Sequence, residues 1–486
     1  MEIMKNNQGT TVVANQNTQL KKSLSKWDLL TIGVGAVVGW SWVIYAGVWT
    51  TIPGTVGGVL AFLIGGILCS FVGLAYAELA SAMPRAGGDI VYTFKGLGDR
   101  WAFFAGACVG YGLLTLIVVE TIMLPIILNA LGFPLPKIGP LYTVGGETVY
   151  GSYIFVSVLV NFFFAFLNRK GVEFSKVFQT ITVAVMLLAA VFYVIVGVSL
   201  GDVENAKPLV TSLSGISITL LMVPGFLSGF NVVAQAAEET NVKPKLIGRL
   251  VVITVWASAI FYILIIIGTG LSASLENRET SQIVVLESLV QLFNGSQFAK
   301  MLVAIAALIG MLTSWNAAYL AGSRVLFALG RAKYISTGFA KLHPINKTPT
   351  KAIMFLFGLS SLGALLGTSR VIFTNIVNIS GFMMVCSWLL VVVTFMVLRK
   401  KAPDLHRPYR VAFGGIVGVL AIISLIFFLF LYTPFNPLGG LTLPEWIVLS
   451  IIILTILGLY FKNVHNSNIS REEREKLLFD DSGKSE

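Results

Sequence analysis

The chain has 486 residues, of which 56% are hydrophobic and 12% are charged, and its formal net charge is +11. Soluble domains carry about 25% charged residues, so this composition excludes an ordinary soluble enzyme and indicates an all-α protein that crosses a membrane many times. The excess of Lys and Arg does not point to nucleic acid. These residues stand in short segments between apolar runs, where they set the orientation of membrane helices.

The start of the chain is polar and holds no apolar stretch, so we expect a cytoplasmic segment over residues 1–26 and no cleaved signal peptide. About twelve apolar runs follow, each long enough to span a bilayer, which takes roughly 20 residues. They lie near residues 29–50, 55–82, 101–130, 151–168, 176–199, 212–236, 249–271, 299–329, 351–368, 371–398, 411–433 and 443–461. An even number of spans places both termini on one side of the membrane.

Lys and Arg are divided unevenly between the two sets of loops. Most of them fall in alternate loops, from Lys21 and Lys22 near the start to Arg407 and Arg410 after the tenth run. The opposite loops hold Lys137, Lys207, Arg278, Lys300 and Arg370. By the positive-inside rule the basic set is cytoplasmic. We therefore expect a multi-pass protein of the cytoplasmic membrane with both termini in the cytoplasm.

The first apolar run carries its own breaking point. Residues 31–50 hold four glycines, and Trp40, Ser41 and Trp42 stand close to the middle. Glycine weakens a helix by about 1 kcal/mol relative to alanine, and freed backbone within a membrane is tolerated only where it lines a cavity or is buried in protein. The run thus predicts a ligand site at mid-membrane. The alternative is that the glycines only allow close helix packing.

The sixth run is broken in a similar way, because Pro224, Gly225 and Gly229 interrupt it at mid-depth. Proline removes one hydrogen bond and costs about 3 kcal/mol in a regular helix, although an ordinary proline kink is the alternative. The two broken runs are five helices apart. Corresponding breaks in two halves of a chain indicate inverted repeats with a substrate site at the midplane.

Several polar side chains lie within or beside the apolar runs. Glu120 lies deep in the third run, where an unpaired carboxylate is costly, so it is a functional candidate unless it is paired in helix packing. Glu78 lies near the cytoplasmic end of the second run and suits an ion pair with a loop cation or a gating role. For Thr313 and Ser314 in the eighth run, the sequence leaves two alternatives: their hydroxyls line a polar path, or they bond to the backbone of their own helix.

Signs of catalysis are absent from the sequence. It contains no GxxxxGK[ST] phosphate loop, its three histidines lie outside the apolar runs, and its three cysteines lie inside them. We interpret these cysteines as small buried hydrophobic residues and not as a disulfide or a metal site. We expect no enzyme activity, no metal and no cofactor.

Six segments in register resemble the amino acid–polyamine–organocation superfamily of secondary transporters. They are GVGAVVGWSW (33–42), YAELASAMPRAGGDIVY (76–92), LNRKGVEFSK (167–176), GFNVVAQAAEE (229–239), SRVLFALGR (323–331) and LRKKAPDLHRPYRV (398–411). The resemblance implies a LeuT-like fold with two inverted five-helix repeats over residues 27–410. Two peripheral helices over 411–462 and a cytoplasmic tail over 463–486 would follow.

The function that the resemblance implies is secondary active or exchange transport of an amino acid or related amine by alternating access. Within transport, the alternative substrate is an amine or polyamine without a carboxylate, because Trp40 and Ser41 replace the small Ser/Thr and Gly that the family usually has. From another class, the alternative is a membrane nutrient sensor without net transport. The expected partners are the small-molecule substrate and the lipid bilayer, with no nucleic acid.

The resemblance places the substrate between the two breaks. The candidate substrate site therefore comprises Val38, Gly39, Trp40, Ser41 and Trp42 at the first break and Gly225, Phe226, Leu227, Ser228 and Gly229 at the second. Glu120 is added because an unpaired carboxylate is costly in the membrane.

Energy coupling is expected to depend on few groups. Some proton-coupled relatives carry a lysine in the middle of the fifth helix, and Met186 stands at about that position. A thioether does not titrate, so exchange or facilitated flux is favoured. Glu120 remains the candidate for proton linkage, and a sodium site at the first and eighth helices, near Thr313 and Ser314, is the weaker option.

Overall fold

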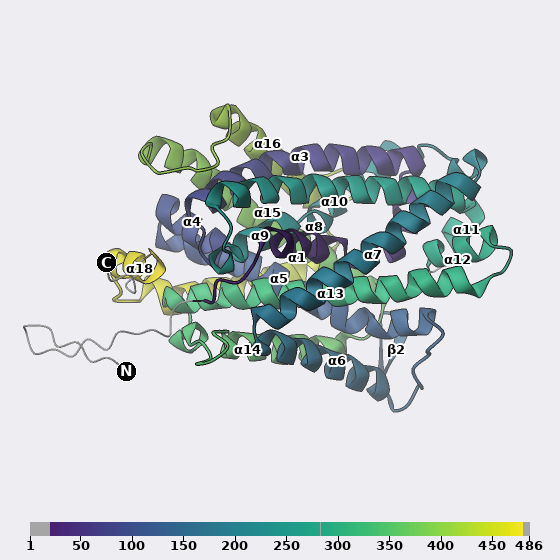
Figure 1. The fold of residues 1–486 in the computed structure, drawn as a ribbon, viewed down its shortest axis with the longest axis horizontal. Helices are drawn as coiled ribbons and strands as arrows, with labels where there is room; N and C mark the ends of the chain where they lie inside the picture. The colour runs from purple at the N-terminus through teal and green to yellow at the C-terminus, as the bar shows by residue number, and fades with distance from the viewer. Residues whose placement is uncertain (1–19, 282, 480–486) are drawn as a thin grey trace, which may run out of the picture.

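The structure is a computed structural model that describes residues 20–281 and 283–479. Figure 1 shows long helices packed side by side, with α1, α8 and α9 in the middle of the bundle. The helices are α1 Lys26–Val38, α2 Ser41–Thr51, α3 Thr55–Ala82, α4 Gly88–Leu97, α5 Asp99–Ala130, α6 Gly151–Lys170, α7 Val172–Leu200, α8 Leu213–Phe226, α9 Gly229–Gln235, α10 Pro244–Ser272, α11 Leu275–Thr280, α12 Val284–Leu292, α13 Gln297–Arg331, α14 Thr350–Gly363, α15 Arg370–Lys401, α16 Gly414–Tyr432, α17 Leu443–Tyr460 and α18 Arg471–Phe479. One antiparallel hairpin joins β1 Pro140–Val144 to β2 Glu147–Tyr150.

The predicted apolar runs are all helical. Among the described residues, ten helices are long and apolar enough to cross a membrane, and the bent pair α1–α2 makes an eleventh. The remaining run, near residues 351–368, is a shorter apolar helix, Thr350–Leu366. The predicted all-α, multi-pass membrane fold is therefore confirmed.

The first span breaks where its glycines predict. Ser25 and Asp28 form a reciprocal capping box that starts α1. The helix ends at Val38 because Gly39 adopts a φ of +43°, a region that suits glycine and strains other residues. After Gly39 and Trp40 the chain restarts as α2, which is bent by 49° from α1.

The second break lies later than the sequence predicts. Helix α8 continues through Pro224 and Gly225 to Phe226, and the interruption falls at Leu227 and Ser228, before α9. Proline loses only its own N–H, and the next turn closes because the Leu227 N–H donates to the Val223 carbonyl at 3.0 Å. The prediction that Pro224 itself interrupts the helix is wrong.

Glycines let the broken helices touch each other. A Cβ at Gly229 of α9 would lie 2.2 Å from the Gly33 carbonyl oxygen of α1, and one at Gly310 of α13 would lie 2.1 Å from the Gly39 carbonyl oxygen. Any side chain at these positions would push the backbones apart. The close approach predicted for glycine-rich helices therefore occurs here together with the breaks.

Several shorter elements lie outside the predicted spans. Helix α4 follows Gly87, and the β-hairpin, α11 and α12 connect spans. In the tail, α18 docks on the bundle, with Arg474 Nη1 at 2.9 Å from Asp99 Oδ1. The predictions for residues 1–19 and 480–486 fall outside the described residues.

Candidate functional site

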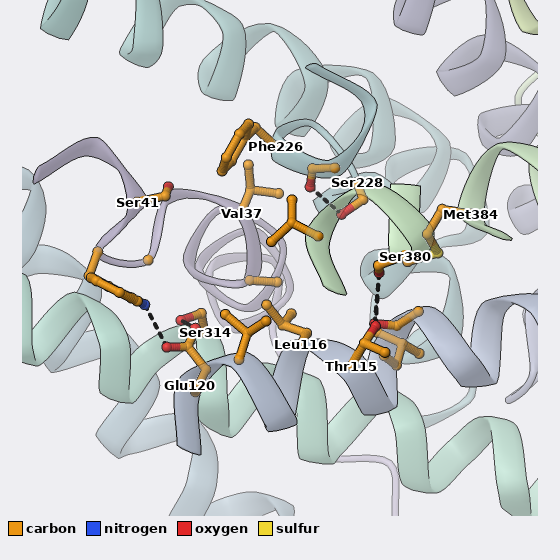
Figure 2. Close-up of a pocket in the computed structure, with 18 of the residues that line it drawn as sticks. Val37, Ser41, Thr115, Leu116, Glu120, Phe226, Ser228, Ser314, Ser380 and Met384 are labelled. Atoms are coloured by element: carbon orange, nitrogen blue, oxygen red, sulfur yellow. Dashed lines mark hydrogen bonds between the residues drawn. The ribbon is translucent and has the colours of Figure 1, made fainter. Parts of the chain in front are cut away.

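A cavity of about 100 Å³ lies between the two breaks, enough for several water molecules. Residues of α1, α2, α5, α8, α9, α13 and α15 line it, and most of them are apolar. Figure 2 shows Glu120 and Ser314 at one end and Thr115 with Ser380 at the other. A mostly apolar cavity with a few convergent polar groups is the usual form of a small-molecule site.

Glu120 reaches this cavity from α5. The residues of this helix that line the wall recur at spacings of three and four, which keeps them on one helix face; they are Gly112, Leu113, Thr115, Leu116, Val119 and Glu120. The side chain is buried, and both of its oxygens accept hydrogen bonds. Trp40 Nε1 donates to Oε2 at 2.6 Å, and the Ser314 hydroxyl bonds to Oε1. Glu120 therefore links the first break to α13.

Protonation of Glu120 requires no rearrangement of its neighbours. The Ser314 hydroxyl also lies 3.1 Å from the Met311 carbonyl oxygen. When Glu120 is charged, the Ser314 hydroxyl can donate to it. When Glu120 is protonated, the hydroxyl can donate to the Met311 carbonyl instead and accept a hydrogen bond from the carboxyl group. The carboxyl group can thus be charged or neutral with the same partners.

Aromatic rings cover one side of the cavity. Tyr45 packs on Phe226 with ring centroids 5.2 Å apart and on Phe373 at 5.5 Å, and Phe373 in turn lies 6.1 Å from Trp40. Tyr45 was not predicted as a site residue. It stands four residues after Ser41, on the same face of α2, and this spacing could have identified it.

The last carbonyls of α1 accept hydrogen bonds from neighbouring side chains. The Tyr262 hydroxyl donates to the Val37 oxygen at 2.7 Å, and the Ser41 hydroxyl lies 3.2 Å from the Val38 oxygen and 2.8 Å from the Tyr262 hydroxyl. Ser41 lines the cavity, yet its hydroxyl is held against Tyr262 of α10. The break is therefore braced by hydrogen bonds from Ser41 and from Tyr262 of α10.

The structure brings most of the predicted substrate residues to the cavity. Those that line it are Gly39, Trp40, Ser41, Glu120, Gly225, Phe226 and Ser228, together with Ser314. A Cβ added at Gly225 would meet nothing within 4 Å, so this glycine borders open space.

The other predicted substrate residues lie outside the cavity lining. Val38 and Leu227 are fully buried in the core, and Gly229 packs against α1. Trp42 packs between Tyr193 and Phe261. These positions support the break without facing the cavity.

Met186 and Thr313 lie close to the first break. A Cβ at Gly310 would be 3.0 Å from Met186 Sδ, next to the Gly39 carbonyl. The Thr313 hydroxyl lies 2.7 Å from the Gly310 carbonyl oxygen and 3.3 Å from that of Gly35. Among the described residues no three His, Cys, Asp or Glu side chains cluster as metal ligands would.

Two buried ion pairs close the side of the bundle where α9 ends. Arg324 of α13 donates two hydrogen bonds to Glu239, at 2.6 and 2.7 Å, and both side chains are at most 2% exposed. Glu238 pairs with Arg331 at 3.2 Å and accepts from the Ala86 N–H at 2.8 Å. Burial opposes the charge of Glu238, but Arg331 and this N–H outweigh it and keep its pKa below the usual value.

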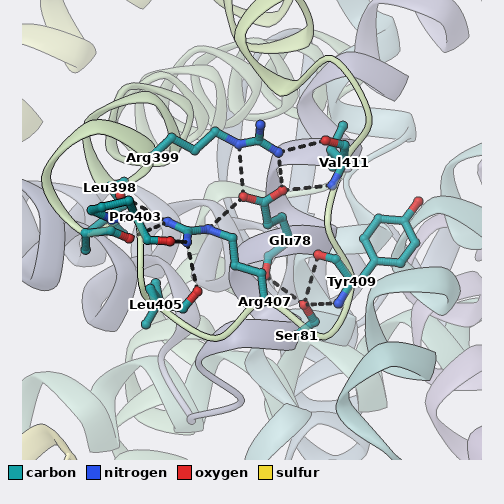
Figure 3. A network of polar contacts seen from close by, with 10 residues as sticks. Glu78, Ser81, Leu398, Arg399, Pro403, Leu405, Arg407, Tyr409 and Val411 are labelled. Carbon is teal, nitrogen blue, oxygen red and sulfur yellow. Dashed lines mark hydrogen bonds and ion pairs between the residues drawn. The ribbon is translucent and has the colours of Figure 1, made fainter.

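Glu78 lies in a third polar cluster at the same end (Figure 3). Its carboxylate pairs with Arg399 at 2.5 Å and with Arg407 at 3.0 Å, and it accepts from the Val411 N–H at 2.8 Å. The predicted pairing of Glu78 with a loop cation is therefore present. It fixes the basic loop after α15 onto the end of α3.

A polar pair missed by the sequence reasoning closes the far end of the cavity. Thr115 of α5 donates to Ser380 of α15 at 2.9 Å. Both residues line the cavity, and they are its polar groups opposite Glu120. Single hydroxyl residues in apolar runs are common, so nothing in the sequence marks these two.

A membrane bundle with two broken helices meeting at a partly polar cavity defines a transporter of small molecules. The sequence matches the amino acid permease family over residues 24–458. The chain belongs to this family, within the amino acid–polyamine–organocation superfamily, and is an amino acid transporter.

Several curated relatives from Bacillus subtilis are similar along most of the chain. The branched-chain amino acid permease BcaP is 27% identical, over 91% of this chain and 93% of that protein. The methylthioribose transporter is 24% identical, over 87% of this chain and 90% of that protein. The serine/threonine exchanger SteT is also 24% identical, over 85% of this chain and 92% of that protein.

Proposed function

We propose that the chain moves a neutral, largely apolar amino acid across the cytoplasmic membrane by alternating access, with the substrate held between the two breaks. The cavity bordered by Gly225 and Glu120 is the observation that carries this proposal. Its wall is mostly apolar and contains one carboxylate. None of the described residues that line it is Lys, Arg or His, so an acidic substrate side chain would find no cationic partner.

Glu120 is proposed to receive the substrate's amino group. Its Oε2 faces the first break, where Trp40 now donates to it, and its other oxygen is held by Ser314. Ser228 and the backbone near Gly225 would complete the amine site from the second break. The name of BcaP, a branched-chain amino acid permease, agrees with an apolar substrate side chain.

The proposed topology has residues 27–410 as an inverted-repeat core, with α16 and α17 peripheral and both termini cytoplasmic. The contacts near both ends of the described chain support a common side of the membrane. Leu24 bonds with Glu239 and Thr240, at the same end of the bundle as the ion pairs. Near the other end of the chain, the Phe479 carbonyl accepts a hydrogen bond from Arg85 Nη2. The basic loop that Glu78 holds belongs to this end, which favours a cytoplasmic side. The protein would carry out transport without catalysis.

Exchange or facilitated flux is the proposed transport mode, because Met186 cannot titrate. Glu120 is the candidate for any proton linkage, since it can be charged or neutral with the same partners. Sodium is less favoured. The hydroxyls that such a site would use are already bonded, since that of Thr313 lies 2.7 Å from the Gly310 carbonyl oxygen and that of Ser314 bonds to Glu120.

The test is uptake into proteoliposomes that contain the purified protein, with a panel of labelled amino acids and amines. Saturable uptake of leucine, valine or isoleucine that depends on the protein is the expected result. Uptake of amines in preference to amino acids would support the alternative without a carboxylate. Saturable binding without flux would favour a sensor and contradict the proposal.

A further inference from the structure

Trp40 forms a hydrogen bond with Glu120, which is the one acidic residue among the described residues that line the cavity. Trp40 itself belongs to the first break (Gly39 and Trp40), which we call the hinge. The indole N–H can only donate, and it lies 2.6 Å from Glu120 Oε2. Trp40 is 3% exposed and stands directly between α1 and α2, with no other hydrogen bond recorded for its side chain in the described structure. The acid is therefore satisfied by the chain itself.

The neighbouring Trp42 shows that this arrangement is not a general feature of the break. Its indole N–H is buried and has no hydrogen-bond partner among the described residues. Its ring packs on Tyr193 and Phe261, outside the cavity. The two tryptophans flank Ser41 with similar burial, but they differ in whether the N–H meets an acid.

A substrate ammonium and an indole N–H are both donors that suit the same carboxylate oxygen. Each carboxylate oxygen can accept more than one bond, but Ser314 already bonds to Oε1 and Trp40 to Oε2, so an amine that approaches from the cavity has to share these oxygens or displace the indole. An ammonium makes the stronger, charge-assisted bond. A ligand without an amine has nothing with which to displace the indole.

We propose that Trp40 is an internal competitor for the amine site, which occupies Glu120 until an ammonium-bearing substrate replaces it. Trp40 then sets the affinity for ligands that carry an ammonium group, because each of them must compete with the indole for Glu120. Ligands that lack the amine neither displace the indole nor gain from its loss. This inference rests on the proposed function, in which the amino group binds Glu120.

Displacement of Trp40 would also change the packing at the hinge between α1 and α2. The residue follows Gly39, whose φ of +43° ends α1, and its ring lies 6.1 Å from that of Phe373. Phe373 packs on Tyr45, which packs on Phe226 of α8. Movement of the indole thus acts on both broken helices, and substrate binding is linked to the change of conformation that transport needs.

The experiment compares Trp40→Phe with the matched control Trp42→Phe. Each change removes one indole N–H and keeps an aromatic ring. Three ligands of one shape are measured on the purified proteins: L-leucine, 3-methylbutylamine, which lacks the carboxylate, and 4-methylpentanoate, which lacks the amine. In Trp40→Phe we expect leucine and the amine to bind about tenfold more tightly, as the loss of a competing bond to a charged group implies.

The same substitution should leave 4-methylpentanoate unchanged, and Trp42→Phe should leave all three affinities within about twofold of the original protein. Unchanged or weaker amine binding in a folded Trp40→Phe protein would overturn the inference. Glu120→Gln separates the two proposals. If it weakens amine binding while Trp40→Phe does not strengthen it, the amine site stands and the competitor role fails. If neither variant alters amine binding, both fail.

A second measurement avoids reliance on the folding of Trp40→Phe. In the unmodified protein and in Trp42→Phe, 3-methylbutylamine should change tryptophan fluorescence because the indole of Trp40 leaves the carboxylate. In Glu120→Gln the change should be lost. A signal of equal size in Glu120→Gln, or none in the unmodified protein at saturating amine, would contradict displacement of Trp40.

Discussion

Substitution of Arg324 by methionine should open the cavity toward the side of the bundle where α9 ends. Arg324 belongs to α13, whereas Glu239 follows α9, so their two hydrogen bonds of 2.6 and 2.7 Å join elements that must separate for the substrate to leave by this route. Both side chains are at most 2% exposed. Arg324→Met would leave Glu239 buried with its charge unpaired.

The size of the effect follows from this burial. Removal of one partner of a buried ion pair costs about 3–5 kcal/mol. The cost falls on the closed form, because opening lets water reach Glu239. A bias of this size shifts the ratio of open to closed molecules by roughly a hundredfold to several thousandfold, at about 1.4 kcal/mol per factor of ten.

The assay is labelling of a single cysteine in the cavity by a membrane-impermeant maleimide. Ser228→Cys supplies the cysteine in a protein whose three native cysteines have been replaced. Inside-out vesicles present the cytoplasmic face to the reagent. Labelling in Arg324→Met should be at least ten times faster than with Arg324 in place, and labelling from the opposite face should slow.

Two further variants test the reasoning. Arg324→Met combined with Glu239→Leu replaces the pair by apolar groups, which is often neutral, so labelling should return toward the original rate. Lys207→Met removes one partner of an ion pair in which both side chains are more than half exposed, and it should have almost no effect. The reasoning is refuted if folded Arg324→Met labels no faster, or if the double variant labels as fast as the single one.

Three other changes have defined outcomes. Glu120→Gln should weaken binding of leucine about tenfold or more while leaving 4-methylpentanoate unchanged, as measured by competition on the purified protein. In proteoliposomes, an imposed pH gradient should change leucine uptake little, whereas Met186→Lys should add a pH-dependent component; strong proton drive that survives in Glu120→Gln would contradict this assignment. Burial raises the pKa of Asp89 on α4 to about 6, against the bonds from Ser387, Tyr76 and Gln235. Since the folded value exceeds the ordinary 3.8, the melting temperature should fall as pH rises from about 4 to about 6 and then level off, and Asp89→Asn should flatten this profile.

The local features of the sequence predict local features of the fold. Apolar runs identify the spans, and the glycines of the first run predict the break that Gly39 makes. The second break is displaced because proline weakens a helix without fixing where it ends. Helix α18 was missed although Ser470 caps it by accepting from the Glu473 N–H, a signal that a capping search would detect.

The partners of the polar groups could not be predicted in the same way. Trp40 and Glu120 are 80 residues apart, and Glu239 and Arg324 are 85 apart. Membrane helices impose no local periodicity that links such residues, so the pairing depends on tertiary packing. Sequence could mark Glu120 as costly in a membrane. It could not reveal that the donor satisfying it is the tryptophan at the hinge.

Binding of labelled leucine to Gly225→Leu tests the central claim, that the substrate lies between the two breaks. A Cβ at Gly225 meets nothing within 4 Å, so the added side chain fills the cavity without displacing backbone. Gly358→Leu is the control, because Gly358 is exposed on α14 and also borders open space. The account predicts loss of saturable leucine binding in Gly225→Leu, with an unchanged melting temperature, and full binding in Gly358→Leu. Normal leucine affinity in Gly225→Leu would contradict it.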